Sequence, residues 1–275
     1  MNERDRFRAA AVQMTSGTDV AANLREAGRL IAQAAKVKAA LVVLPENFSF
    51  MGADDAARVQ AAEADGDGAA QQFAREQARQ HGIWLVAGTI PIRHQGGRVL
   101  SRSLLVGPDG GIAASYDKIH LFDVSLPASE GESYRESATT VAGDRVVTHG
   151  TDSGRIGMSV CYDIRFPALF ASLGSAGMDL LVVPAAFTVP TGRVHWQPLL
   201  KARAIESLVY VVASGQWGEH AGGRLTYGHS MIVGPWGDVR AECADGAGIA
   251  HADVDMIELR QLRRQFPVLD HRREF

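Results

Sequence analysis

The stretch RIGMSVCYDIRFPALF, residues 155–170, contains the signals that decide the fold around it. Residues 156–160 form an apolar run typical of a buried strand, and the run ends abruptly at Cys161. A helix is expected to follow, because Pro167 is well tolerated in the first turn of a helix. The pattern therefore predicts a strand, a sharp turn at Cys161 and a helix.

A cysteine on such a turn is a candidate nucleophile. We expect the sulfur of Cys161 to lie close to a helix N-terminus, where the helix dipole and free N–H groups favour thiolate over thiol. The same N–H groups can bind a developing oxyanion. On this segment alone, a small buried core thiol is an equally good interpretation.

Composition excludes several classes of protein. The 275 residues are 46% hydrophobic and 21% charged, with a net charge of −3, which argues against a dedicated nucleic-acid binder. No apolar run is long enough to span a membrane, and the charged N-terminus does not resemble a secretory signal. We therefore expect a cytoplasmic protein in which Cys161 and Cys243 are free thiols, with Cys243 in a structural role.

Metal and nucleotide sites have no support in the sequence. The nine histidines form no HExxH motif and no pairing with CxxC, so no zinc site is predicted. Neither a Walker loop nor GxGxxG occurs. The arginine-rich segment 258–273 could suggest RNA, but a helix with a solvated face is the favoured interpretation. The expected partner is thus a small molecule, with no cofactor, no nucleic acid and no membrane.

Helical and strand patterns alternate along the chain. Residues 99–121 predict a hairpin that turns at Pro-Asp-Gly-Gly, residues 123–144 a polar loop, and residues 266–275 an extended tail. Short turns between several strands imply mixed sheets in one domain. The main expected helices cover residues 20–38, 68–81, 195–208 and 256–265, and the main expected strands cover residues 7–13, 39–44, 83–92, 156–160 and 178–185.

One internal similarity suggests two related halves. AALVVLPENF (residues 39–48) and DLLVVPAAF (residues 179–187) each follow a predicted helix, and each has a proline at the end of its strand. The likeness is too short to count as a sequence repeat.

Three reactive side chains follow predicted strands: Glu46, Lys118 and Cys161. Ligands usually bind at that edge of an α/β sheet. Singly, Glu46 could cap the next segment and Lys118 could be a surface lysine. Together, Cys161 would attack a carbonyl or nitrile carbon and Glu46 would be the general base. Lys118 would then stabilise the oxyanion with the backbone N–H of Tyr162.

The glutamate of LPENF, the lysine of YDKIHLFDV and the cysteine of GMSVCYDIRFP together resemble the pattern of the nitrilase (carbon–nitrogen hydrolase) superfamily. The resemblance covers nearly the whole chain. It implies an α/β fold, a four-layer α-β-β-α sandwich with mixed sheets, and a single carbon–nitrogen hydrolase domain over residues 1–275. It also implies catalytic roles for Glu46, Lys118 and Cys161, and a homodimer or a larger homo-oligomer.

A further glutamate of the superfamily, a second base or a positioning group, follows the lysine in an ES…G segment. ESATTVAGD (residues 136–144) matches that segment, so the resemblance points to Glu136. Glu130 and Glu132 lie nearby but lack the glycine at the matching distance.

Within the superfamily, several segments, above all residues 260–273, are similar to amidases that act on linear amides with a 2-oxoglutaryl acyl group. Whether the leaving group is a dipeptide or ammonia stays open, and a catalytically idle scaffold that binds a partner is the alternative from another class. Arg165 could bind the acyl carboxylate or form a structural ion pair. Phe187 and Thr188, which follow a predicted strand, are expected to line the pocket with Tyr162.

Three further expectations concern structural contacts. His195 is a candidate neighbour of the pocket, and Trp196 is expected to have a structural role. Arg203 and Glu206 could form an internal salt bridge. The apolar residues of the arm 266–275 need a surface to cover, so this arm is expected to take part in oligomer contacts.

Overall fold

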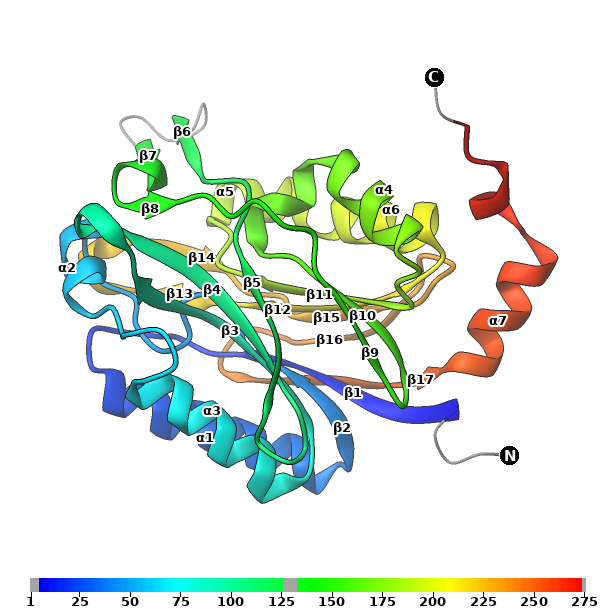
Figure 1. Cartoon of the computed structure of the whole chain (residues 1–275), viewed down its shortest axis with the longest axis horizontal. Helices are drawn as coiled ribbons and strands as arrows, with labels where there is room; N and C mark the ends of the chain where they lie inside the picture. The colour runs from blue at the N-terminus through cyan, green and yellow to red at the C-terminus, as the bar shows by residue number, and fades with distance from the viewer. Residues whose placement is uncertain (1–4, 126–132, 274–275) are drawn as a thin grey trace.

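The computed structural model describes residues 5–125 and 133–273. Two mixed sheets pack face to face (Figure 1). The first sheet has the order β17 (Gly248–Asp255), β1 (Arg6–Gln13), β2 (Ala39–Val43), β3 (Trp84–Arg93), β4 (Val99–Val106) and β5 (Ile112–Asp117), with β8 (Thr140–Val141) beside β4.

The second sheet repeats the plan of the first. Its order is β16 (Val239–Glu242), β15 (Met231–Val233), β12 (Tyr210–Gly215), β11 (Leu180–Ala185), β10 (Gly154–Met158) and β9 (Thr148–Thr151). Two hairpins stand apart, one formed by β13 (Trp217–Glu219) and β14 (Leu225–Tyr227), the other by β6 (Asp123–Ser125) and β7 (Ser133–Arg135).

Helices form the two outer layers. Figure 1 shows α1 (Val20–Lys36) and α3 (Ala69–His81) on the first sheet, and α4 (Pro167–Ser175) and α6 (Gln197–Ser207) on the second. The predicted four-layer sandwich is therefore confirmed. The shorter helices are α2 (Asp55–Gln60), α5 (Val189–Thr191), the π-helical turn η5 (Gly192–Trp196) and the 3-10 turns η2 (Gln95–Gly97), η3 (Glu136–Ala138), η4 (Cys161–Arg165), η6 (Ala221–Gly223) and η7 (Val268–His271).

Alternating side chains of the strands build two hydrophobic cores. On β1, Ala9 and Ala11 belong to the core between the sheets, whereas Ala10 and Val12 belong to the core under α1 and α3. This alternation is the period of two that a strand imposes on its side chains. No helix among the described residues is long and apolar enough to cross a membrane.

The expected similarity of the two halves is visible in the sheets. Strand β2 pairs in parallel with β1 and β3, and β11 pairs in parallel with β10 and β12. Both central strands are followed by the residues that face the cavity described below, Glu46 after β2 and Phe187 after β11.

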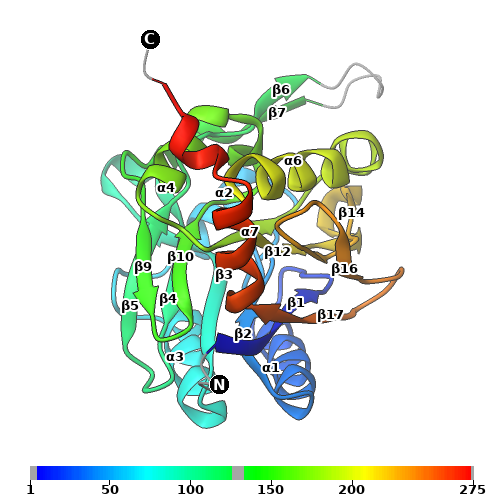
Figure 2. The same ribbon diagram turned by 90° about the vertical axis from the view of Figure 1, so that its right-hand side faces the viewer.

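Some local expectations are wrong. The loop expected at residues 123–144 contains β6, β7, η3 and β8, and α2 is an additional short helix. The helix expected from residue 195 is preceded by helical turns from Val189 onwards. The tail is not simply extended, because it contains η7, and Phe266 packs edge-on against Trp236. Figure 2 shows α7 (Met256–Gln265) leading into this tail along one side of the sandwich.

Candidate active site

The strand ends bring four of the sequence-predicted residues to one cavity. Glu46 follows β2, Lys118 follows β5, Cys161 follows β10, and Glu136 opens η3. All four line a cavity of about 510 Å³, a size that suits a small-molecule ligand. No cluster of His, Cys, Asp or Glu side chains that could hold a metal ion occurs within residues 5–125 and 133–273.

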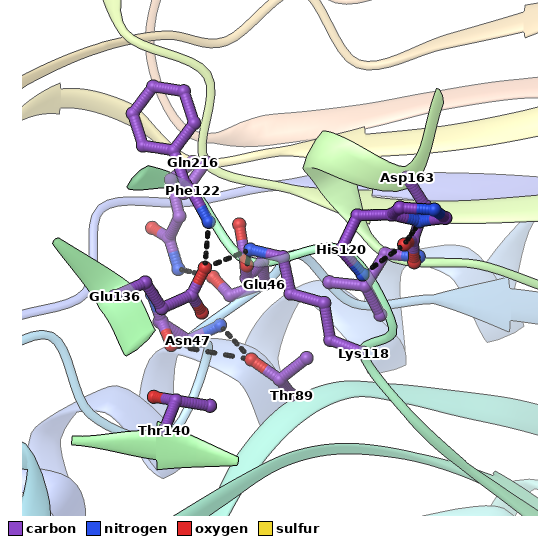
Figure 3. Close-up of polar contacts among 12 residues, drawn as sticks. Glu46, Asn47, Thr89, Lys118, His120, Phe122, Glu136, Thr140, Asp163 and Gln216 are labelled. Atoms are coloured by element: carbon purple, nitrogen blue, oxygen red, sulfur yellow. Dashed lines mark hydrogen bonds and ion pairs between the residues drawn. The ribbon is translucent and has the colours of Figure 1, made fainter. Parts of the chain in front are cut away.

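Lys118 lies between two carboxylates (Figure 3). Its Nζ donates to Glu46 Oε1 and to Glu136 Oε2, each at 2.8 Å. The side chain is only 2% exposed, and burial alone would lower the pKa of the ammonium. The charges of Glu136 and Glu46 outweigh burial and raise the pKa of Lys118 above its ordinary value. Lys118 is therefore a buried cation that lines the cavity.

Each oxygen of Glu136 has at least one hydrogen-bond partner. Oε2 accepts from Lys118 and from the backbone N–H of Phe122 at 2.8 Å, and Oε1 lies 3.4 Å from Arg58 Nη1. Burial acts to raise the pKa of Glu136, but Lys118 and Arg58 lower it to about 2. Glu136 thus stays ionised at neutral pH and is a poor proton acceptor. Glu130 and Glu132 lie outside the described residues.

The turn that presents Glu46 is fixed by its neighbours. Asn47 has a φ of +59°, and its backbone N–H donates to Thr89 Oγ1 at 2.8 Å. Gln216 Nε2 donates to the carbonyl oxygen of Glu46 at 3.0 Å. On the other side, a Cβ at Gly88 would overlap the carbonyl oxygen of Pro45, so only glycine fits there.

The turn at Cys161 is strained and held by one buried carboxylate. Cys161 has a φ of +46°, which is uncommon for a residue with a side chain. Asp163 Oδ2 accepts from the backbone N–H of Val160 at 2.9 Å and from Tyr116 OH at 2.7 Å. Asp163 Oδ1 accepts from the backbone N–H of His120 at 2.9 Å. Asp163 therefore links the cysteine turn to the segment that follows Lys118.

The pKa of the Cys161 thiol shifts in the opposite direction to the one expected from a helix N-terminus. The strand–turn–helix order is present, but Cys161 is the first residue of the 3-10 turn η4, and α4 begins only at Pro167. Burial, together with the carboxylate of Glu46, raises the pKa of the Cys161 thiol. Lys118 and the backbone N–H of Ala186 act in the opposite direction but do not overcome them. The raised pKa favours the neutral thiol, which needs a base before it can attack.

The four residues expected around the substrate also line the cavity: Tyr162, Arg165, Phe187 and Thr188. The guanidinium of Arg165 lies 5.1 Å from the centre of the Phe187 ring and 5.7 Å from that of Tyr162. Its Nη1 lies 3.1 Å from His195 Nδ1. Burial and the charge of Arg165 lower the pKa of His195, so a neutral imidazole can accept this hydrogen bond.

The alternative of a structural ion pair for Arg165 finds no support, since no carboxylate of the described residues pairs with it. Trp196 is buried, and its Nε1 donates to the carbonyl oxygen of His229 at 2.8 Å, as expected of a structural residue. Arg203 and Glu206 form the expected ion pair at 2.7 Å. Cys243 is buried and free.

Four arginine and tyrosine side chains of the cavity were not anticipated from the sequence: Arg58, Tyr134, Arg135 and Arg224. Arg58 comes from α2, Tyr134 and Arg135 come from β7, and Arg224 precedes β14. None of them belongs to a local motif. The only hint for Arg224 is the glycine pair before it, which marks a turn.

Comparison with known proteins gives the family. Residues 8–264 match the model of the carbon–nitrogen hydrolase family. A Synechocystis protein (strain PCC 6803 / GT-S) named deaminated glutathione amidase is 42% identical over 97% of this chain and 98% of its own length. The human protein of the same name is 39% identical over 96% of this chain and 81% of its own length.

Solved structures agree with this assignment. The Caenorhabditis elegans NitFhit protein is 38% identical with a TM-score of 0.91, and the match covers 98% of this chain but 65% of that chain. Nit3 of Saccharomyces cerevisiae, a member of branch 10 of the nitrilase superfamily, is 30% identical with a TM-score of 0.85, over 96% of this chain and 95% of that chain.

A third structure is an amidase from Nesterenkonia sp., 26% identical with a TM-score of 0.78, over 94% of this chain and 99% of that chain. It is a Glu-to-Gln variant that carries acrylamide added to its active-site cysteine. The predicted superfamily and the predicted hydrolysis of a C–N bond are confirmed by the family match and the relatives. This chain belongs to the carbon–nitrogen hydrolase family.

Proposed function

We propose that this protein hydrolyses the amide of deaminated glutathione to 2-oxoglutarate and cysteinylglycine, through a thioester on Cys161. The relatives named deaminated glutathione amidase, at 39–42% identity over nearly the whole chain, support the substrate. The observation that carries the chemistry is the Lys118 ammonium between Glu46 and Glu136, in the cavity that Cys161 also lines.

In the first half of the reaction, Glu46 accepts the proton of the Cys161 thiol, and the sulfur attacks the amide carbon. An ammonium has three protons, and two of those on Lys118 are donated to Glu46 and Glu136. The third is available to the oxyanion, with the backbone N–H of Tyr162 as a second donor. Protonated Glu46 then gives its proton to the leaving nitrogen, the C–N bond breaks, and cysteinylglycine departs.

In the second half, water attacks the thioester and Glu46 accepts a proton from it. The C–S bond breaks, 2-oxoglutarate forms, and the proton on Glu46 returns to the sulfur. The raised pKa of Cys161 supports this cycle. A neutral thiol needs Glu46 to remove its proton before the attack, and Glu46 returns a proton to the sulfur at the end. Glu136 acts as a positioning residue, because both of its oxygens are engaged with other groups.

The acyl part of the substrate ends in a 2-oxo acid. We propose that Arg165 binds this carboxylate. Its guanidinium lies against the rings of Phe187 and Tyr162 and forms no ion pair with a described carboxylate. Thr188, directly after Phe187, completes this wall of the cavity. Charged hydrogen bonds between guanidinium and carboxylate provide both affinity and orientation.

The test compares kcat/KM for deaminated glutathione with kcat/KM for α-ketoglutaramate and succinamate, substrates of an omega-amidase. Deaminated glutathione should be the best of the three, because its larger leaving group offers contacts that can be used in the transition state. An enzyme that hydrolyses α-ketoglutaramate or succinamate at least as efficiently would be an omega-amidase instead. Hydrolysis of none of them would favour an idle scaffold.

We further propose that residues 1–275 form one domain, which acts in the cytoplasm as a homodimer or a larger homo-oligomer. The shared core between the sheets, with members from Ala9 to Leu259, supports a single unit, and the two free thiols fit a reducing compartment. Trp236 is 62% exposed and adjoins Phe266, which is also exposed, so an apolar patch is available for association.

A further inference from the structure

The cavity has more cationic than anionic side chains. Among the described residues, its cations are Lys118 and four arginines, and its carboxylates are those of Glu46, Asp54 and Glu136. Lys118 and Arg58 are paired with these carboxylates. Two of the remaining arginines, Arg165 and Arg224, are partly buried and pair with no described carboxylate. A dianionic substrate would balance this excess of positive charge.

Arg224 is held firmly but incompletely used. Its Nη2 donates to the carbonyl oxygen of Ala186 at 3.0 Å, and its guanidinium lies 4.9 Å from the centre of the Tyr134 ring. Its Nε is buried and has no hydrogen-bond partner among the described residues. A buried donor without a partner is costly, and a guanidinium has five donors in a fork that matches a carboxylate. The side chain is therefore suited to an anionic ligand.

The guanidiniums of Arg165 and Arg224, which pair with no described carboxylate, both contact one short segment, residues 186–187. Arg165 lies against the ring of Phe187, and Arg224 donates to the carbonyl oxygen of Ala186, the preceding residue. A hydrogen bond from the backbone N–H of Ala186 lowers the pKa of the Cys161 thiol. The nucleophile therefore lies beside the same segment. A linear substrate with a carboxylate at each end can place its scissile amide at Cys161 and its two carboxylates at the two arginines.

We propose that Arg224 binds a carboxylate on the leaving group, so that the site selects amides whose leaving amine is itself a carboxylic acid. In deaminated glutathione this is the carboxylate of the terminal glycine. The proposal rests on the proposed function, with Arg165 binding the acyl end. It makes Arg224 the residue that separates this substrate from α-ketoglutaramate, which releases ammonia and has no carboxylate on that side.

The first experiment measures kcat/KM of wild type, Arg224→Gln and Arg224→Lys for three substrates: deaminated glutathione, its glycinamide form and α-ketoglutaramate. Arg224→Gln should lower kcat/KM for deaminated glutathione by about 10- to 100-fold relative to α-ketoglutaramate, the size expected for a hydrogen bond between charged groups. Arg224→Lys, which keeps the charge but not the fork, should lose less. The glycinamide substrate should show no such selective loss.

Arg165→Gln is the matched control, since it should lower kcat/KM for all three substrates. An equal loss on deaminated glutathione and α-ketoglutaramate in Arg224→Gln would overturn the proposal, because Arg224 would then act only by fixing Ala186. Thermal melting of each variant separates this result from a loss of folding.

A second readout is independent of the preferred substrate. Cysteinylglycine should inhibit hydrolysis of α-ketoglutaramate by the wild type, and its inhibition constant should rise about 10-fold or more in Arg224→Gln. Cysteinylglycinamide should inhibit both proteins equally weakly. If the wild type prefers α-ketoglutaramate but inhibition still depends on Arg224, the proposed substrate fails and the carboxylate site stands. Inhibition that is the same in both proteins contradicts the carboxylate site.

Discussion

Among single residues, Lys118 lies between two buried carboxylates and could either stabilise the oxyanion or bind the carboxylate of the substrate. If its third proton stabilises the oxyanion, Lys118→Ala should lower kcat by about 10²–10³-fold with a smaller change in KM. Steady-state kinetics measures both. A large rise in KM with an unchanged kcat would make Lys118 an anchor for the substrate carboxylate.

Removing Lys118 also leaves the buried carboxylate of Glu46 without its cation and Glu136 with Arg58 alone, which can cost about 3–5 kcal/mol of stability. The double variant Lys118→Ala/Glu136→Gln removes one of the two carboxylates that lose Lys118. We expect it to melt at a higher temperature than Lys118→Ala and to be just as inactive. Recovery of activity in the double variant would show that the loss in Lys118→Ala came from misfolding.

The Glu46 carboxylate raises the pKa of Cys161, while Lys118 lowers it. Glu46→Gln should therefore lower the pKa of the Cys161 thiol. At the same pH, a larger fraction of Cys161 would then be thiolate. We expect the pH midpoint for alkylation by iodoacetamide to fall in Glu46→Gln although amide hydrolysis is lost. Cys161→Ala provides the background labelling of Cys243. An alkylation midpoint that is unchanged or higher would contradict the charge balance described here.

At the scale of elements, the turn after β2 depends on a glycine in β3. Gly88→Ala would push its Cβ into the carbonyl oxygen of Pro45, next to Glu46. We expect a loss of about 1–3 kcal/mol in the free energy of unfolding and a fall in kcat. The matched control is Gly28→Ala in α1, where a Cβ would lie 3.5 Å from the Phe73 ring.

Because alanine is favoured over glycine inside a helix, Gly28→Ala should stabilise the protein by up to about 1 kcal/mol. Its activity should not change. Urea unfolding measures both variants under the same conditions. A Gly88→Ala protein as stable and active as Gly28→Ala would refute the close packing of β3 against the Glu46 turn.

At the scale of the whole molecule, the exposed pair Trp236 and Phe266 connects the fold to the proposed oligomer. Deleting residues 266–275, or replacing Trp236 with serine, should shift the protein towards the monomer, because each change removes apolar surface available for association. Val146→Ser, at an exposed apolar residue elsewhere, is the control. Light scattering reports the mass at micromolar concentration. A monomeric full-length protein would contradict the proposal.

The sequence predicts most of this fold because long elements have strong patterns. α1 shows helical spacing of Ala27, Leu30, Ile31 and Ala34, and β11 is apolar throughout. The elements that were missed, such as α2 and β6 to β8, are short and have no such pattern. Tertiary contacts stabilise them: Arg58 of α2, for example, reaches Glu136 and Thr140.

The site residues also divide into those with a local sequence signal and those without one. Glu46, Lys118 and Cys161 could be proposed because each follows a strong strand, and Glu136 because of a family resemblance. The pKa of Cys161 could not be predicted, since burial and the charge of Glu46 are properties of the folded protein. Arg224 was missed for a similar reason: nothing local distinguishes an arginine that faces a cavity from one that faces water.

The proposed mechanism depends on an acyl intermediate between Cys161 and the 2-oxoglutaryl group of deaminated glutathione. The most direct test is to mix enzyme and substrate, quench the reaction in acid during turnover, and map adducts by mass spectrometry. We expect a 2-oxoglutaryl thioester on the peptide that contains Cys161, and none in Cys161→Ala. An adduct on Cys243, or hydrolysis by Cys161→Ala at a substantial rate, would contradict it.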